Sequence, residues 1–238
     1  MEQRTKGIVF QAIKYKDNQI IAKIFTERYG LKAFMVRSGK SAKTSVIPLL
    51  QPLSIVELTT HSKENSSLLQ LKQLRLATPF SDIPFNPIKS SIVLFLDEVL
   101  TKTIAEDYQN DDLFTFIEYA LLLLDHSSDI KNFHLWFLME LSRHYGFYPS
   151  IENPEASYFD FNTGESQDFK PSHPNYITGK SKELWFKLVD QKFEHITQIP
   201  LTGEDRRQML EHLVKYIQLH LENLREIKSL EVLRELFA

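Results

Sequence analysis

The hydrophobic periodicity of this chain changes once, at the proline-rich stretch ATPFSDIPFNP of residues 77–87. Before this stretch, short segments alternate apolar and polar residues, as β-strands with one buried face do. After it, apolar residues recur every three or four positions, as they do along one face of a helix. The change predicts an α+β chain, with a β domain over residues 1–80 and a helical domain over residues 81–238.

Five short strands are predicted in the first domain, separated by turn residues such as Asp17-Asn18 and Arg28-Tyr29-Gly30. A slip in the alternation at Ala12-Ile13 indicates a bulge in the first strand. Five strands of this length favour a small closed barrel, SH3-like or OB-type, because closure removes exposed strand edges. The predicted strands cover residues 5–16, 19–27, 31–37, 53–60 and 68–77, and the last of these is also compatible with a helix.

The second domain is predicted to be helical. Its first helix has Ser90 or Ser91 in the capping region, and a later one begins at Thr202, where Thr202 and Asp205 match a capping box. The helix over residues 132–145 is apolar nearly all round, which is typical of a helix buried in the middle of its domain. The predicted helices cover residues 88–108, 111–125, 132–145, 181–192, 202–224 and 229–237.

Residues 147–178 interrupt the helical pattern. This segment is rich in Pro, Asn, Ser and aromatic residues, and residues 158–165 within it predict a small hairpin with its turn at 162–164. We therefore expect an irregular insertion in the helical domain.

Charge is distributed unevenly along the chain. The net formal charge is -3, but residues 1–80 carry 13 Lys and Arg against 5 Asp and Glu, and the remainder carries 15 against 26. Chance segregation of solvated surface charge is the alternative explanation. A basic domain joined to an acidic one favours a polyanion-binding region attached to a body with another role.

Cations and aromatic residues are interleaved in the basic domain, most densely over residues 19–44. Binders of single-stranded nucleic acid need both, because cations follow the phosphates while aromatic rings stack on bases. Phe25 and Phe34 occupy apolar positions and are expected in the core, whereas Tyr15 and Tyr29 adjoin cations and are better stacking candidates. The candidate DNA-binding residues are Lys6, Lys14, Tyr15, Lys16, Lys23, Arg28, Tyr29, Lys32, Arg37, Lys40 and Lys43.

Other classes of function find little support. The chain has no cysteine, its eight histidines are scattered, and it has neither a G-x-S-x-G elbow nor a glycine-rich phosphate loop. The paired acids at 97–98 and 111–112 are expected on helix surfaces. We therefore expect no catalytic residues, no metal and no cofactor. Without a transmembrane run or a signal-peptide pattern, we also expect a cytoplasmic protein.

Several segments, in this order and spacing, resemble the RecO family of bacterial recombination mediators. They are GIVFQAIKYKDNQIIAKIFTERYG (7–30), GK (39–40), LQPLSIVEL (50–58), SSIVLFLDEVL (90–100) and FLMELSRHYGFYP (137–149). The resemblance covers nearly the whole chain. It implies an N-terminal OB-fold barrel followed by a helical C-terminal domain.

The resemblance also implies a function and partners. From the resemblance we expect this protein to bind single- and double-stranded DNA at the nucleoid, to anneal complementary strands and to form a complex with RecR. It contacts the C-terminal tail of single-stranded DNA-binding protein and thereby indirectly helps RecA load onto coated strands. The alternative is a protein–protein adaptor whose basic barrel binds an acidic partner and has little affinity of its own for DNA.

One departure from the family pattern concerns the insertion. Many members carry a four-cysteine zinc site after the Gly-Phe-x-Pro segment, and this chain has none of those cysteines. Zinc is therefore not expected here. We expect residues 158–165, in the corresponding stretch, to be held by aromatic packing instead.

Overall fold

The computed structural model describes residues 2–39, 45–61 and 68–236, and it divides into two compact units, Met1–His126 and Ser127–Ala238. The first contains the β-barrel and two helices, and the second contains the remaining helices and a small sheet. The domain boundary near residue 80 stays a prediction.

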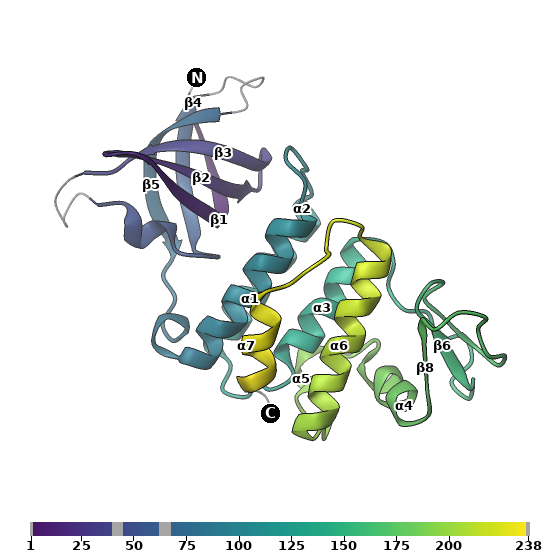
Figure 1. Cartoon of the computed structure of the whole chain (residues 1–238). Helices are drawn as coiled ribbons and strands as arrows, with labels where there is room; N and C mark the ends of the chain where they lie inside the picture. The colour runs from purple at the N-terminus through teal and green to yellow at the C-terminus, as the bar shows by residue number, and fades with distance from the viewer. Residues whose placement is uncertain (1, 40–44, 62–67, 237–238) are drawn as a thin grey trace. The chain divides into compact units, whose positions relative to one another are not determined.

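The barrel has five strands: β1 (Glu2–Lys16), β2 (Gln19–Thr26), β3 (Gly30–Arg37), β4 (Ile55–His61) and β5 (Leu68–Thr78). They close in the order β1-β2-β3-β5-β4, with β3 and β5 parallel and the other pairs antiparallel (Figure 1). The closed barrel confirms the predicted fold class and is that of an OB-fold. The segment that was also compatible with a helix is strand β5.

Alternate residues of these strands fill the barrel. Ile20 pairs with Val36 and Ala22 pairs with Phe34, and all four side chains are buried in one apolar cluster. Partners in an antiparallel pair point to the same face, so this register directs every second side chain inward. Phe25 and Phe34 are both 0% exposed, which confirms that they belong to the core.

Strand β1 is shared between two neighbours. Its first half pairs with β4, from Glu2 to Ile8, and the part from Gly7 onward pairs with β2. The register of the β1–β2 pair shifts twice, between Val9 and Gln11 and between Lys14 and Lys16, so the bulge predicted at Ala12-Ile13 is misplaced and lies between the two observed irregularities. Residues 11–16 are exposed, and this end of the β1–β2 hairpin carries side chains on two open faces.

The first unit also contains two short 3-10 helices, η2 (Ile47–Leu50) and η3 (Ile83–Phe85), and the helices α1 (Pro87–Thr103) and α2 (Asp111–His126). The predicted cap at Ser90 or Ser91 is wrong, because Asn86 caps α1. Its side chain accepts hydrogen bonds from the backbone N–H groups of Ile88 and Lys89. Pro87 at the first helical position suits this start, because proline lacks the N–H that would be unsatisfied there.

The proline-rich stretch is held by one carboxylate. Asp125, at the end of α2, accepts hydrogen bonds from the backbone N–H groups of Ser81, Asp82 and Ile83 and from the Ser81 hydroxyl. Burial opposes its ionisation, but these hydrogen bonds outweigh burial and lower the pKa of Asp125 to about 2. The buried Lys89 ammonium bridges the Asp82 carboxylate at 2.7 Å and the Asp125 carbonyl oxygen at 2.8 Å.

The helices of the second unit are α3 (Phe133–His144), α4 (Gly179–Leu188), α5 (Phe193–Ile196), α6 (Gly203–His220) and α7 (Ser229–Leu236). Nine of the twelve residues of α3 are buried, as its pattern predicted. The Thr202–Asp205 capping box is present. Three predicted helix ends are wrong: α1 of the first unit stops at Thr103 rather than 108, α4 stops at Leu188 rather than 192, and α6 stops at His220 rather than 224. Residue 237 of the predicted last helix lies outside the described residues.

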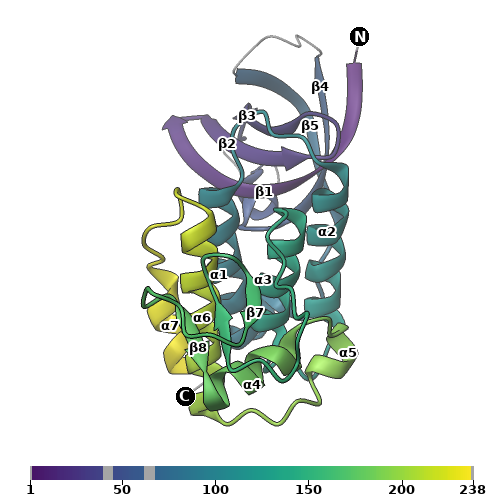
Figure 2. The same cartoon turned by 90° about the vertical axis from the view of Figure 1, so that its right-hand side faces the viewer.

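The predicted hairpin in the insertion is confirmed by β6 (Tyr158–Asp160) and β7 (Glu165–Gln167). A third strand that the pattern missed, β8 (Tyr176–Thr178), completes a sheet of order β7-β6-β8. Helix α4 follows β8 directly (Figure 2) and packs against both β6 and β8.

Candidate nucleic-acid interface

The end of the β1–β2 hairpin separates the predicted side chains onto two faces. Lys14 pairs with Ile20, a residue of the barrel core, so the Lys14 side chain lies on the inner face of the sheet. Ile13 pairs with Ile21 on the opposite face. The register of β1 and β2 shifts between Lys14 and Lys16, so Tyr15 lies at an irregularity of the pairing, and Lys16 pairs with Gln19, which points to the face opposite Ile20. Lys14 and Lys16 therefore lie on opposite faces of the sheet.

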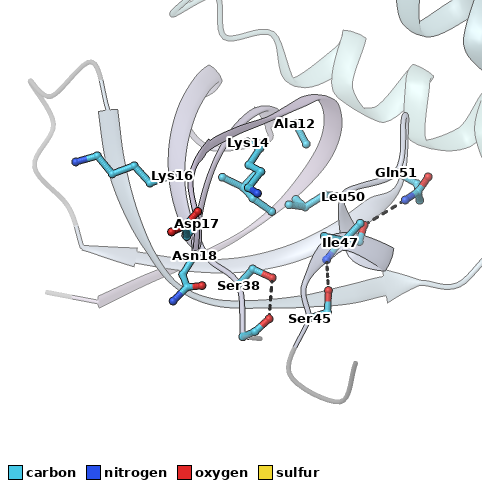
Figure 3. Close-up of a pocket in the computed structure, with 12 residues that line it drawn as sticks. Ala12, Lys14, Lys16, Asp17, Asn18, Ser38, Ser45, Ile47, Leu50 and Gln51 are labelled. Carbon is cyan, nitrogen blue, oxygen red and sulfur yellow. Dashed lines mark hydrogen bonds between the residues drawn. The ribbon is translucent and has the colours of Figure 1, made fainter. Parts of the chain in front are cut away.

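The inner face borders a pocket of about 840 Å³. Its wall comes from β1, the β1–β2 turn, the end of β3 and η2, and its floor is apolar. Figure 3 shows Lys14 and Leu50 in the middle of this hollow, whereas the Lys16 side chain extends away from it. The lining residues are Ala12, Lys14, Lys16, Asp17, Asn18, Ile20, Ser38, Gly39, Ser45, Ile47, Leu50 and Gln51.

Three of the predicted cations are neutralised within the first unit. Lys6 contacts Glu118 at 2.8 Å, Lys23 contacts Glu106 at 2.7 Å, and Lys32 forms an ion pair with Asp107. The hydrogen bond to Glu118 raises the pKa of Lys6. An ammonium group that already has a carboxylate partner has less to gain from a phosphate, so these three lysines are weaker candidates for DNA contact.

Four other predicted cations form no ion pair with any residue that the structure describes: Lys14, Lys16, Arg28 and Arg37. Lys16 lies 5.4 Å from the Tyr15 ring centre and Arg28 lies 5.7 Å from the Tyr29 ring centre. The remaining two candidates, Lys40 and Lys43, lie outside the described residues.

The two predicted stacking residues differ in exposure. Tyr15 is 55% exposed. Tyr29 is half-buried at the β2–β3 turn, and its hydroxyl donates a hydrogen bond to the Gln3 side chain. Tyr15 therefore has a ring face accessible to a base, whereas Tyr29 is partly occupied in holding the turn.

An apolar row crosses the outer face of the sheet beside Tyr15. Ile13, which is 54% exposed, pairs with Ile21, and Ile21 pairs with Met35 on β3. The unpaired cation Arg37 lies two residues further along β3, on the same face. Our sequence reasoning missed this row, because Ile21 lies between the apolar residues Ile20 and Ala22, and only Ile13 and Tyr15 alternate with polar residues.

The polar residues of the pocket were also missed by the sequence reasoning. Asn18, Ser38 and Gln51 come from three separate turns or connectors, and no pattern in the sequence groups them.

On the β4–β5 side of the barrel, two further cations, Arg4 and Arg75, both form ion pairs with Glu57. Hydrogen bonds from Arg4 and then Arg75 lower the pKa of Glu57.

No group of three or more His, Asp or Glu side chains that could hold a metal ion occurs among the described residues. Two strongly shifted groups lie on helices α1 and α3. Burial, reinforced by Glu98, raises the pKa of Asp97 to about 7, and burial lowers the pKa of His134 to about 3. Asp97 is thus partly buried rather than on a solvated helix surface as expected.

None of the helices in the part of the chain that the structure describes is long and apolar enough to span a membrane.

Comparison with known proteins finds similarity along the whole chain. A family model described as "Recombination protein O N terminal" matches residues 1–80, and one described as "Recombination protein O C terminal" matches residues 84–231. A DNA repair protein RecO from Flavobacterium psychrophilum is 39% identical over 241 residues, covering all of both chains. Proteins of the same name from Flavobacterium johnsoniae and Bacteroides fragilis are each 35% identical, again over the full length of both chains.

Proposed function

The chain belongs to the RecO family, whose role lies in DNA repair and recombination, and from this premise we propose that it is a DNA-binding recombination mediator without catalytic activity. It binds single- and double-stranded DNA through the barrel and anneals complementary strands.

The observation that carries the proposal is the set of uncompensated cations on the barrel. Lys14, Lys16 and Arg37 have no carboxylate partner among the described residues. Lys14 and Lys16 are on β1, and Lys16 and Arg37 both pair with Gln19 of β2. A cation without a carboxylate partner binds a DNA phosphate favourably, because the contact releases counterions that are condensed on the DNA. The exposed Tyr15 ring adds a surface on which a base can stack.

Annealing by such a surface needs no bond chemistry. Two complementary strands repel each other through their phosphates, and a basic surface reduces that repulsion while it raises the local strand concentration. The residues proposed to act are therefore binding residues only, and no metal or cofactor is required.

The proposed partners follow from membership of the family. We assign to this chain a complex with RecR and contact with the C-terminal tail of single-stranded DNA-binding protein. Acting in the cytoplasm at the nucleoid, the complex helps RecA load onto coated strands. A tail contact would require an apolar groove with a cation placed for the terminal carboxylate.

The test is fluorescence anisotropy with a labelled single-stranded oligonucleotide over a range of salt concentrations. The variant Lys14→Glu/Lys16→Glu/Arg37→Glu is expected to lose about a hundredfold or more in affinity at low salt, and the slope of log K against log salt should fall by about two to three. The matched control reverses three exposed cations of the second unit, Lys187, Lys192 and Arg225, and produces the same change in net charge.

Equal affinity loss in both variants would mean that only net charge matters, which removes the site assignment. Wild-type protein that fails to bind even at low salt would favour the adaptor function, in which the basic barrel binds an acidic protein.

A further inference from the structure

The pocket behind Lys14 has a composition that phosphate contact alone does not explain. Its floor contains Ile20 and Leu50, both of which belong to the buried core of the barrel, and its edge includes the exposed Ile47. A groove that only follows the backbone of DNA needs cations and little apolar surface. Apolar floors with a few placed polar groups are instead characteristic of pockets that take a compact, flat, partly apolar ligand.

The polar groups around this floor suit the edge of a nucleobase. Asn18 and Gln51 supply amide groups, Ser38 supplies a hydroxyl, and Asp17 supplies one carboxylate. Amide and carboxylate groups pair with the donors and acceptors on base edges. A carboxylate would repel a bare phosphate, so its presence among the lining residues favours a base in the pocket and a phosphate at the Lys14 ammonium.

The walls are held in place before any ligand arrives. Pro48 lies at the start of η2, and the Gln51 amide donates a hydrogen bond to the Ile47 carbonyl oxygen at 3.2 Å (Figure 3). Leu50 is anchored in the barrel core. A pocket formed by ordered residues loses little conformational entropy on binding.

We propose that this pocket receives the base of an unpaired nucleotide, with Lys14 contacting the adjoining phosphate, so that the barrel selects single-stranded over duplex DNA. In a duplex each base is stacked and paired, and extruding it costs a few kcal/mol that an unpaired strand does not pay. The inference rests on the proposed DNA binding and adds to it the part of DNA that is recognised.

The experiment compares two oligonucleotides of equal length, a thymidine oligonucleotide and its fully abasic counterpart, which keeps the phosphates and lacks the bases. Binding of wild-type protein is measured by anisotropy at matched salt. We expect about tenfold tighter binding of the thymidine oligonucleotide, with equal salt slopes, because one base in an apolar site contributes on that order.

The variant Ala12→Ile adds a branched apolar side chain to the pocket wall without changing charge, at a position that is exposed in the strand. It is expected to remove the preference for the thymidine oligonucleotide. The control Gln11→Ile places the same side chain at the adjacent position, which pairs with Lys23 rather than facing the pocket, and should keep the preference. Stacking on Tyr15 would also favour the thymidine oligonucleotide, so the wild-type preference is assigned to the pocket only if Tyr15→Ala keeps it, and this second comparison stands even if Ala12→Ile folds poorly.

The outcomes separate the two proposals. If the wild-type protein binds both oligonucleotides equally, the base does not enter the pocket, while DNA binding itself stands. If Ala12→Ile weakens both equally, the pocket contacts only the backbone and the inference fails. If neither oligonucleotide binds, the proposed function fails as well. If Ala12→Ile abolishes binding of an acidic peptide and leaves both oligonucleotides unaffected, the pocket belongs to a protein partner.

Discussion

The barrel and the small sheet β6–β8 are both built from hairpins, but they are stabilised differently. The barrel strands are long enough to close on themselves, and their own alternate side chains form the core. The small sheet has three strands of three residues each, which enclose nothing. A sheet this short is not stable by its own pairing and depends on what packs against it.

Aromatic rings from α4 and α6 supply that support. The Trp185 ring centre lies 5.3 Å from that of Phe159 and 5.2 Å from that of Phe161, and Tyr216 lies 5.4 Å from Trp185. The Tyr216 hydroxyl also donates a hydrogen bond to the Phe147 carbonyl oxygen at 2.6 Å. The aromatic packing expected for residues 158–165 is present, and its partners come from helices later in the chain.

A buried carboxylate completes the support. Asp160 accepts hydrogen bonds from the Asn162 N–H at 2.8 Å and from the Gln167 amide at 3.1 Å, and its carboxylate lies 3.1 Å from His173 Nε2. The Asn175 N–H donates to His173 Nδ1, so Nε2 carries the proton and donates to Asp160. The closed barrel is thus stabilised by side chains of its own strands, whereas the short β6–β8 sheet needs contacts from outside the sheet.

Truncating one core ring in each region should give the largest effects. Phe34→Ala in the barrel and Phe159→Ala in the small sheet each remove a fully buried ring, and each should lower the free energy of unfolding by about 3–5 kcal/mol. Phe34→Ala should remove hydrogen-exchange protection from all five barrel strands, whereas Phe159→Ala should remove it only within residues 147–178. Chemical denaturation and hydrogen exchange measured by mass spectrometry provide the check.

Tyr15→Ala is the control for this pair, because its exposed ring should change stability by less than about 1 kcal/mol. Loss of protection confined to the β2–β3 hairpin in Phe34→Ala would show that the barrel is not one cooperative unit.

Alanine substitution at three glycines with positive φ should destabilise the protein by amounts that depend on how closely other groups approach the added methyl group. A methyl group at Gly30 would overlap the Tyr108 carbonyl oxygen, one at Gly164 would lie 2.6 Å from the Tyr216 hydroxyl, and one at Gly146 would meet nothing within 4 Å. Substitution by alanine at any of them costs about 1–2 kcal/mol of backbone strain. The loss of stability should therefore be largest for Gly30→Ala and smallest for Gly146→Ala, as measured by thermal denaturation.

Removing the Tyr216 hydroxyl tests whether a clash with it causes the intermediate loss of stability expected for Gly164→Ala. Gly164→Ala combined with Tyr216→Phe should show a favourable coupling in a double-mutant cycle. Equal losses at Gly164 and Gly146 would mean that the Tyr216 ring moves aside at no cost.

The smallest effect is expected from Asp160→Asn. Asp160 Oδ2 accepts hydrogen bonds from both Gln167 and His173, and an amide NH2 group in its place could accept neither. Local stability should therefore fall by about 1–2 kcal/mol. Limited proteolysis of residues 147–178 should accelerate, with Glu152→Gln, an exposed residue of the same segment, as the matched control. An unchanged cleavage rate would assign the stability of the small sheet to the aromatic rings alone.

Features set by near neighbours could be predicted from the sequence. These include the strand alternation, the buried α3 helix, the core positions of Phe25 and Phe34, and the Thr202–Asp205 capping box. The N-terminal cap of α1 was misassigned because Asn86 and Ser90 are both capping residue types, and only the backbone geometry decides which side chain reaches the free N–H groups. Strand β8 was missed because three residues are too few to show a period.

Local patterns in the sequence were enough to predict a closed barrel followed by helices, because periodicity, turns and caps depend on residues a few positions apart. The cations of the basic domain that have no carboxylate partner could be identified only from contacts in the folded chain. Lys6 is 112 positions from its partner Glu118, and Lys23 is 83 positions from Glu106. Ion pairs over such separations depend on how the folded elements meet, so a local pattern of charge contains no record of them.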